Sequence, residues 1–149
     1  MDRLPFIVLV FLAGAFYPVQ AVVNARLAQS VGGPVWAAFA SFLGGTVILL
    51  VAALVMVGPP RMAALAETPW YVWTGGVFGA LLVFAMALSA PRLGTGALLA
   101  LIVCAQMMMA LALDRFGILQ PVRALGPWQV AGTVLLLAGV VMVVFGPRD

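Results

Sequence analysis

The chain has 149 residues, of which 66% are hydrophobic and only 7% are charged. A soluble globular protein has about half of its residues apolar and about a quarter charged. The seven basic and four acidic side chains of this sequence are too few to cover a water-soluble surface. The composition therefore excludes a soluble domain and predicts an all-α integral membrane protein embedded in the lipid bilayer.

The residue types that are missing exclude most enzymes. The sequence has no His or Lys, and its single cysteine is Cys104. A His/Cys zinc site, a Cys–His or Ser–His catalytic pair and a P-loop lysine are therefore excluded. The four acids are too scattered along the chain for a hydrolytic dyad or a calcium loop. We predict no enzymatic activity, no metal or cofactor and no nucleic-acid binding.

Apolar segments alternate with short polar connections along the whole chain. Each segment is long enough to cross the hydrocarbon layer, which takes about 20 residues of helix. The third and fourth segments are joined by a very short predicted link, PRLG (Pro91–Gly94), and the longest loop is Asp114–Pro127. In chain order, the predicted transmembrane helices span residues 5–28, 34–57, 70–90, 95–113 and 128–145, and together they form a single transmembrane domain.

A cleaved signal peptide is the alternative interpretation of the first apolar segment. Arg3, the following apolar run and Val19-Gln20-Ala21 loosely match that pattern. The apolar stretch nevertheless continues without a break past Asn24, and cleavage would leave four spans. We therefore favour a first transmembrane helix.

The arginines divide almost evenly between the two sides of the predicted bundle. A near-even division gives almost no preferred orientation, because orientation follows the excess of basic residues on one side. A chain without a preferred orientation could insert both ways, and two oppositely inserted copies would form an antiparallel dimer. Four arginines fall on one side (Arg3, Arg61, Arg115 and Arg123) and three on the other (Arg26, Arg92 and Arg148).

An antiparallel dimer would bring opposite charges from the two copies to the same level. Asp114 of one copy would lie level with Arg92 and Arg26 of the other, so these residues are candidate ion pairs across the dimer. A local role for Asp114, as a helix cap or as a surface ion pair with Arg115, is the alternative.

Three polar residues share one face of the first predicted helix. Tyr17, Gln20 and Asn24 lie within about 60° of one another at 100° per residue. Polar side chains in hydrocarbon need partners or a wet cavity. The face therefore either binds a substrate or joins helices by hydrogen bonds, as Asn and Gln often do in membranes.

The other helices offer fewer polar groups and several small residues. Gln106 is the strongly polar residue of the fourth helix, and it too either binds a ligand or joins helices. Ser41 and Gly45, with Ala37, repeat at every fourth position of the second helix, and Gly75 and Gly79 do so on the third. Small residues at this spacing let helix backbones approach closely, so we predict helix packing at Gly45, Gly75 and Gly79.

Three stretches of the sequence closely resemble the YdcZ-like family of small bacterial inner-membrane proteins. Their shared motifs fall on Gln20 and Asn24, on Ser41-Phe42 with Gly45, on Pro91–Gly94 and on Gln106, whereas Ala105 and Arg115 depart from the family pattern. This family lies in the drug/metabolite transporter superfamily and is distantly related to the small multidrug resistance proteins. The resemblance implies five transmembrane helices, dual-topology or paired-gene assembly and a transport role. The stretches are Gln20–Leu50, Pro69–Leu101 and Leu113–Leu119.

The sequence as a whole predicts a secondary transporter of a small organic solute. The transporter would work by alternating access, as an antiparallel homodimer or as a heterodimer with a homologue. A non-transporting membrane subunit that assembles with or regulates a paired homologue is the alternative. No predicted helix centre carries an acid, so a neutral or zwitterionic substrate is easier to accept than a bare cation. The predicted substrate-binding residues are Tyr17, Gln20, Asn24, Ser41 and Gln106.

Overall fold

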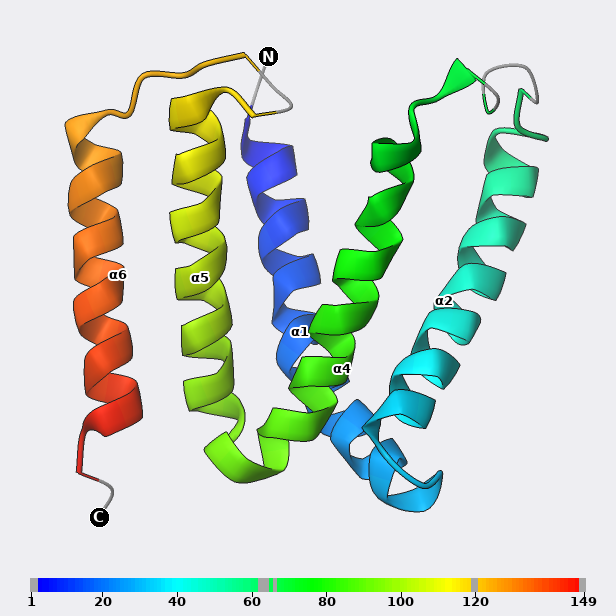
Figure 1. Cartoon of the computed structure of the whole chain (residues 1–149), viewed down its shortest axis with the longest axis horizontal. Helices are drawn as coiled ribbons and strands as arrows, with labels where there is room; N and C mark the ends of the chain where they lie inside the picture. The colour runs from blue at the N-terminus through cyan, green and yellow to red at the C-terminus, as the bar shows by residue number, and fades with distance from the viewer. Residues whose placement is uncertain (1–2, 62–64, 66, 119–120, 148–149) are drawn as a thin grey trace. The chain divides into compact units, whose positions relative to one another are not determined.

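The structure is a computed structural model that describes residues 3–61, 65, 67–118 and 121–147. Five helical spans in this part of the chain are long and apolar enough to cross a membrane, which confirms the predicted all-helical membrane fold. Residues 70–93 form one of these spans from two consecutive helices. In chain order the helices are α1 (Leu4–Ser30), α2 (Pro34–Met56), the 3₁₀ helix η1 (Trp70–Thr74), α4 (Gly75–Leu93), α5 (Thr95–Phe116) and α6 (Pro127–Phe145) (Figure 1).

The chain divides into two compact units, Met1–Arg92 and Leu93–Asp149. The first unit contains α1, α2, η1 and nearly all of α4, and the second contains α5 and α6. Within the first unit α1 packs along α2, and within the second α5 packs along α6. Each of these pairs joins helices that follow one another in the sequence and run in opposite directions (Figure 1).

The turn between α1 and α2 is short because its residues favour a tight reversal of the chain. Gly33 has a φ of +131°, a conformation that residues with a side chain rarely adopt. Pro34 follows as the first residue of α2, where its missing N–H has no helical partner to lose. The chain therefore reverses direction between Ser30 and Pro34, which sets α2 antiparallel to α1.

The predicted and observed helices mostly agree to within one or two residues, and the larger differences concern the third and fourth predicted helices. The predicted link Pro91–Gly94 is mostly helical, because α4 continues through Leu93 and the chain breaks only at Gly94, whose φ is +77°. The third predicted helix begins with the 3₁₀ turn η1. In addition, α5 extends to Phe116 and ends at Gly117, which has a left-handed conformation and donates its N–H to the Leu113 carbonyl at 3.0 Å.

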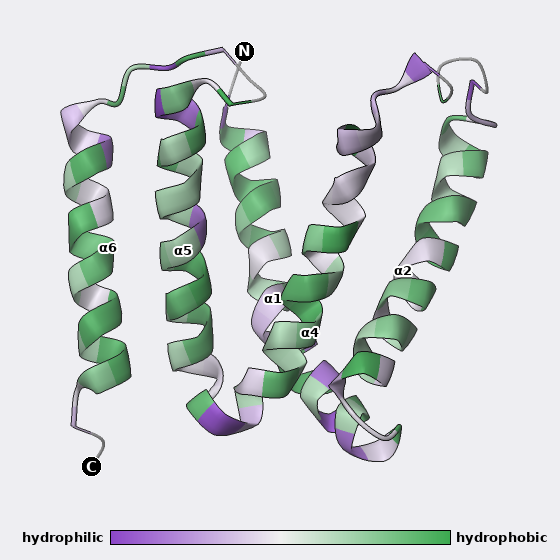
Figure 2. Ribbon diagram, viewed as in Figure 1, coloured by the Kyte–Doolittle hydropathy of each residue, from purple (hydrophilic) through white to green (hydrophobic). Residues whose placement is uncertain are grey.

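Large apolar side chains cover the outer surface of the helices, as a lipid environment requires. Phe11 on α1 is 77% exposed and Leu135 on α6 is 72% exposed, and the helices are hydrophobic on nearly all sides (Figure 2). The residues buried on α1 and α2 are mainly alanines, such as Ala21 and Ala37. Small side chains at a helix contact let the backbones come close, which is the usual packing of membrane helices.

Candidate functional site

A cavity of about 320 Å³ lies within the first unit, between α1, α2 and α4. Four of the side chains that line it carry hydrogen-bonding groups, and they come from the middle parts of α1 and α2. The remaining lining residues are apolar or glycine. The lining residues with hydrogen-bonding side chains are Tyr17, Gln20, Ser41 and Thr46, and the apolar or glycine lining residues are Phe42, Gly45, Leu49, Gly79 and Val83.

The polar face of α1 divides into two parts with different surroundings. Tyr17 is half-buried and Gln20 is exposed, and both line the cavity. Asn24, one turn further on, is only 5% exposed, and its Nδ2 donates to Ser41 Oγ across a distance of 3.4 Å. Asn24 therefore joins α1 to α2, whereas Tyr17 and Gln20 present their polar groups to the cavity.

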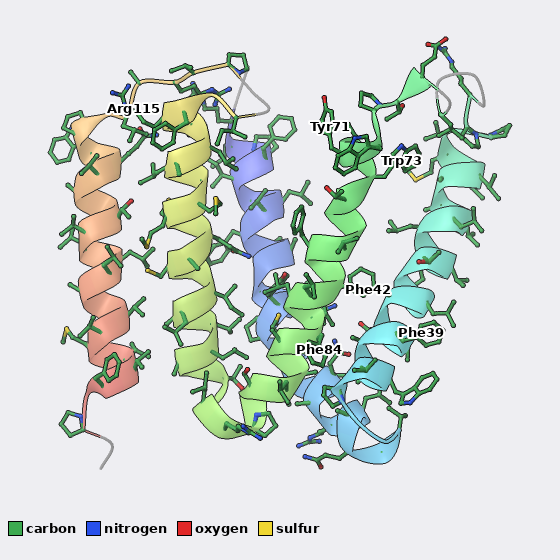
Figure 3. The ribbon with its side chains drawn as sticks, viewed as in Figure 1. Phe39, Phe42, Tyr71, Trp73, Phe84 and Arg115 are labelled. Carbon is green, nitrogen blue, oxygen red and sulfur yellow. The ribbon has the colours of Figure 1, made fainter. Side chains whose placement is uncertain are left out.

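Phe42 separates this cavity from an apolar one on its other side. The second cavity has a volume of about 520 Å³ and lies between α2 and α4, with Phe39, Phe42 and Phe84 among its lining residues (Figure 3). Phe42 lines both cavities. A Cβ placed on Gly79 would lie 3.2 Å from Phe42 Cζ, so the glycine makes room for the ring. Polar and apolar compartments therefore lie side by side within one unit.

Comparison with protein families decides what kind of protein carries this site. Residues 5–142 match the model of a family described as "Putative inner membrane exporter, YdcZ". The chain belongs to this family. Neither curated protein sequences nor solved structures gave a match.

Membership of the YdcZ family agrees with the helices and gives the cellular location. The family's description places it in the inner membrane, and the described part of the chain has five helical spans suited to a bilayer. The protein is therefore a multi-pass protein of the bacterial inner membrane. Among the described residues, no group of three or more His, Cys, Asp and Glu side chains could hold a metal ion.

The structure brings three of the five predicted substrate-binding residues of this YdcZ-family chain to one cavity. Tyr17, Gln20 and Ser41 line it, and Asn24 lies beside it through its contact with Ser41. Gln106 is an exposed residue of α5 and belongs to the second unit. A shared site for Gln106 and the residues of the first unit stays a prediction.

Thr46 lines the cavity, and the sequence reasoning missed it. Thr46 and Ser41 are the two hydroxyl side chains of α2, but they are five residues apart and do not share a narrow face. The signal that could have found Thr46 is its rarity, because α2 is otherwise built from apolar residues and glycine. Any hydrogen-bonding side chain in the middle of such a helix is a candidate for a site or a contact.

The predicted packing glycines have different surroundings within this chain. Gly79 faces the Phe42 ring, whereas a Cβ added at Gly45 or Gly75 would meet no atom within 4 Å. Gly45 instead lines the polar cavity. Helix packing at Gly45 and Gly75 is not seen among the described residues of the first unit, and it stays a prediction.

The residues predicted to form ion pairs across a dimer lie near the ends of their helices. Arg26 and Arg92 are exposed near the ends of α1 and α4, and Asp114 is half-buried in the last turns of α5. Side chains at helix ends lie close to the membrane interface, where charge is tolerated. Arg148, which the charge comparison also counts, lies outside the described residues.

Proposed function

We propose that the protein is a secondary transporter that exports or exchanges a small organic solute, and that the polar cavity of the first unit binds this solute. The description of its family supports export across the inner membrane. The main support for this binding site is a single cavity between membrane-spanning helices. Its lining includes the polar side chains of Tyr17, Gln20, Ser41 and Thr46. Such polar groups are costly in hydrocarbon unless they serve a contact or a site.

The cavity suits an uncharged or zwitterionic solute of modest size. Hydroxyl groups and one amide supply both donors and acceptors, and no charged side chain stands among the described lining residues. Its volume of about 320 Å³ is at the small end of ligand sites. The apolar cavity beyond Phe42 supports a solute that combines hydrogen-bonding groups with an apolar part.

The transport cycle that we propose uses two oppositely inserted copies of the chain. Inverted pairs of membrane units can rock around a site near the midplane and open it alternately to the two sides. Tyr17 and Gln20 lie near the middle of α1, as such a site requires. The near-even division of arginines between the two sides supports this assembly, because it gives neither orientation an advantage.

A flux measurement with matched glutamine variants tests the binding site. Thermal-shift screening of neutral and zwitterionic solutes on the purified protein would first select a solute. Its flux into proteoliposomes would then be measured for Gln20→Ala and for Gln29→Ala, a change near the end of α1 that lies away from the cavity. We expect about a tenfold loss of apparent affinity for Gln20→Ala, from one lost hydrogen bond, and no change for Gln29→Ala.

The opposite results would contradict the proposal in distinct ways. Equal flux for both variants and the unchanged protein would show that Gln20 is not part of the binding site. Flux that requires a second, homologous chain in the same vesicles would instead support a subunit of a paired assembly.

Charge reversal tests the proposed antiparallel pairing. Asp114→Arg should lower the yield of the dimer in detergent, and Arg92→Asp in the same chain should restore part of it, because the two charges would again be opposite across the dimer. Cross-linking and size measurement would report the dimer fraction. No effect of either reversal on the dimer fraction would exclude this pairing.

A further inference from the structure

A groove runs along the contact between α5 and α6 in the second unit, and the transport role does not account for it. It consists of two adjoining cavities, of about 470 Å³ and about 430 Å³. Val103 and Leu136 line both cavities, so the two lie next to each other along the helix pair.

The groove is long and mostly apolar. On α5 it extends from Leu99 to Asp114, and on α6 from Trp128 to Val143. Each stretch rises about 22 Å at about 1.5 Å per residue, which exceeds half of the ~30 Å hydrocarbon thickness. Towards Leu99 and Val143 its lining residues are aliphatic side chains and glycine. An acyl chain that starts at the membrane interface can therefore lie along the groove.

The other end of the groove is polar and lies where α5 ends and α6 begins. Asp114, Trp128 and Gln129 line this end. Trp128 is 88% exposed, and an indole ring at a helix start is typical of the headgroup level. The groove therefore has its polar end at the membrane interface and its apolar end in the hydrocarbon. A lipid molecule has the same arrangement, with a polar headgroup and apolar acyl chains.

Basic groups gather at this polar end. Arg115 follows Asp114 in the last turn of α5 (Figure 3). The Arg123 backbone N–H donates to the Asp114 carbonyl at 2.9 Å, which holds this part of the loop against the end of α5. Two arginines thus lie next to Asp114, one along the helix and one through its backbone, although neither lines the groove. Two basic residues beside one acidic residue near a groove between membrane helices suit a phosphate headgroup.

We propose that the groove between α5 and α6 binds one anionic phospholipid. The phosphodiester lies at Arg115 and Arg123, and one acyl chain lies along the aliphatic part of the groove past Leu136.

Native mass spectrometry of the full-length protein with added dioleoyl-phosphatidylglycerol tests both halves of the site. Gly139→Leu fills the apolar part, where an added Cβ would meet no atom within 4 Å, so the helix pair has room for the change. Ala138→Leu adds the same side chain to the neighbouring position, which does not line the groove. Arg123→Gln removes a positive charge that is proposed to bind the lipid headgroup. Arg61→Gln is its control, because it removes a positive charge from the first unit.

We expect phosphatidylglycerol to bind about tenfold more weakly to Gly139→Leu and to Arg123→Gln and unchanged to the two controls. Phosphatidylcholine should bind more weakly than phosphatidylglycerol, and glycerol 3-phosphate, which has the headgroup phosphate without the acyl chains, should not compete. The proposal is overturned by equal loss in Gly139→Leu and Ala138→Leu, by equal binding of the two lipids, or by full competition from glycerol 3-phosphate. A fall in dimer fraction that accounts for the lipid loss in Gly139→Leu would assign the groove to a second copy and would also overturn it.

Discussion

The two units of the chain are built from the same kind of helix, but the polar residues that line their cavities lie at different depths along these helices. In the first unit, Tyr17, Gln20 and Thr46 lie well inside α1 and α2, and they line a cavity without a charged side chain among its described residues. In the second unit, Asp114 and Gln129 lie in the last and first turns of their helices and line the polar end of an apolar groove.

This difference indicates different roles for the two units. A polar group in the middle of a membrane helix is costly and is retained for a site or a helix contact. A polar group in a terminal turn lies near the headgroups, where it costs little. The depth of the polar residues, rather than their number, therefore separates the proposed solute site from the proposed lipid site.

Filling the first cavity should give the largest effect and tests the comparison most directly. Gly45→Leu places a side chain into the cavity at a position where an added Cβ meets no atom within 4 Å. We expect solute flux in proteoliposomes to fall about tenfold or more, equivalent to at least about 1.4 kcal/mol, with little loss of stability. Gly44→Leu, which has open space but does not line the cavity, should leave flux unchanged.

Two outcomes would break this assignment. Equal flux for the Gly44 and Gly45 variants would show that the cavity is not on the transport path. A loss of dimer for Gly45→Leu would move Gly45 to the predicted helix-packing role, so the dimer fraction is measured on the same samples.

The contact between Gly79 and Phe42 gives the next largest effect. The Cβ of Gly79→Ala would lie 3.2 Å from Phe42 Cζ, and the ring must shift to make room. Because overpacking typically costs about 1–3 kcal/mol, we expect a loss of about 1 kcal/mol in the free energy of unfolding in detergent. Phe42→Leu in the same chain should relieve the loss.

Gly76→Ala is the matched control for this change, because an added Cβ there meets no atom within 4 Å. It should leave the free energy of unfolding unchanged or raise it slightly, since alanine favours a helix more than glycine does. Equal losses for Gly76→Ala and Gly79→Ala would mean that Phe42 does not fix the wall between the two cavities.

The fold could be predicted from sequence because membrane helices depend on composition over about 20 residues, which is a local property. The ends of the helices were harder to predict. Pro91 suggested a link, yet it lies inside α4, and the actual break comes at Gly94, which has a positive φ.

The candidate site could be predicted only in part. Tyr17 and Gln20 share a helix face, and helical periodicity alone reveals that. Periodicity did not distinguish Asn24, whose contact with Ser41 depends on how α2 packs against α1. Thr46 and Phe42 reach the cavity for the same reason, because packing between helices decides which side chains of α2 face α1 and α4.

The hydrogen bond between Asn24 and Ser41 should contribute a smaller, measurable free energy. Polar contacts between membrane helices average about 0.6 kcal/mol in double-mutant cycles, and the 3.4 Å distance is long for a strong bond. We expect a coupling energy near that average for Asn24→Ala combined with Ser41→Ala, from unfolding in mixed micelles. A coupling energy near zero would mean that packing of the alanines, and not this hydrogen bond, holds α1 and α2 together.

The smallest effect is expected for Thr133→Val in the second unit. The Thr133 hydroxyl is buried, but it donates to the Gln129 carbonyl of its own helix at 2.8 Å and so does not join α6 to α5. Valine has nearly the same shape, and the carbonyl keeps its usual helical N–H donor, so nothing is left unpaired. We expect the free energy of unfolding to change by less than about 0.5 kcal/mol. A loss above about 1 kcal/mol would mean that Thr133 holds the two helices together, as Asn24 does in the first unit, and the contrast between the units would then not extend to how their helices are joined.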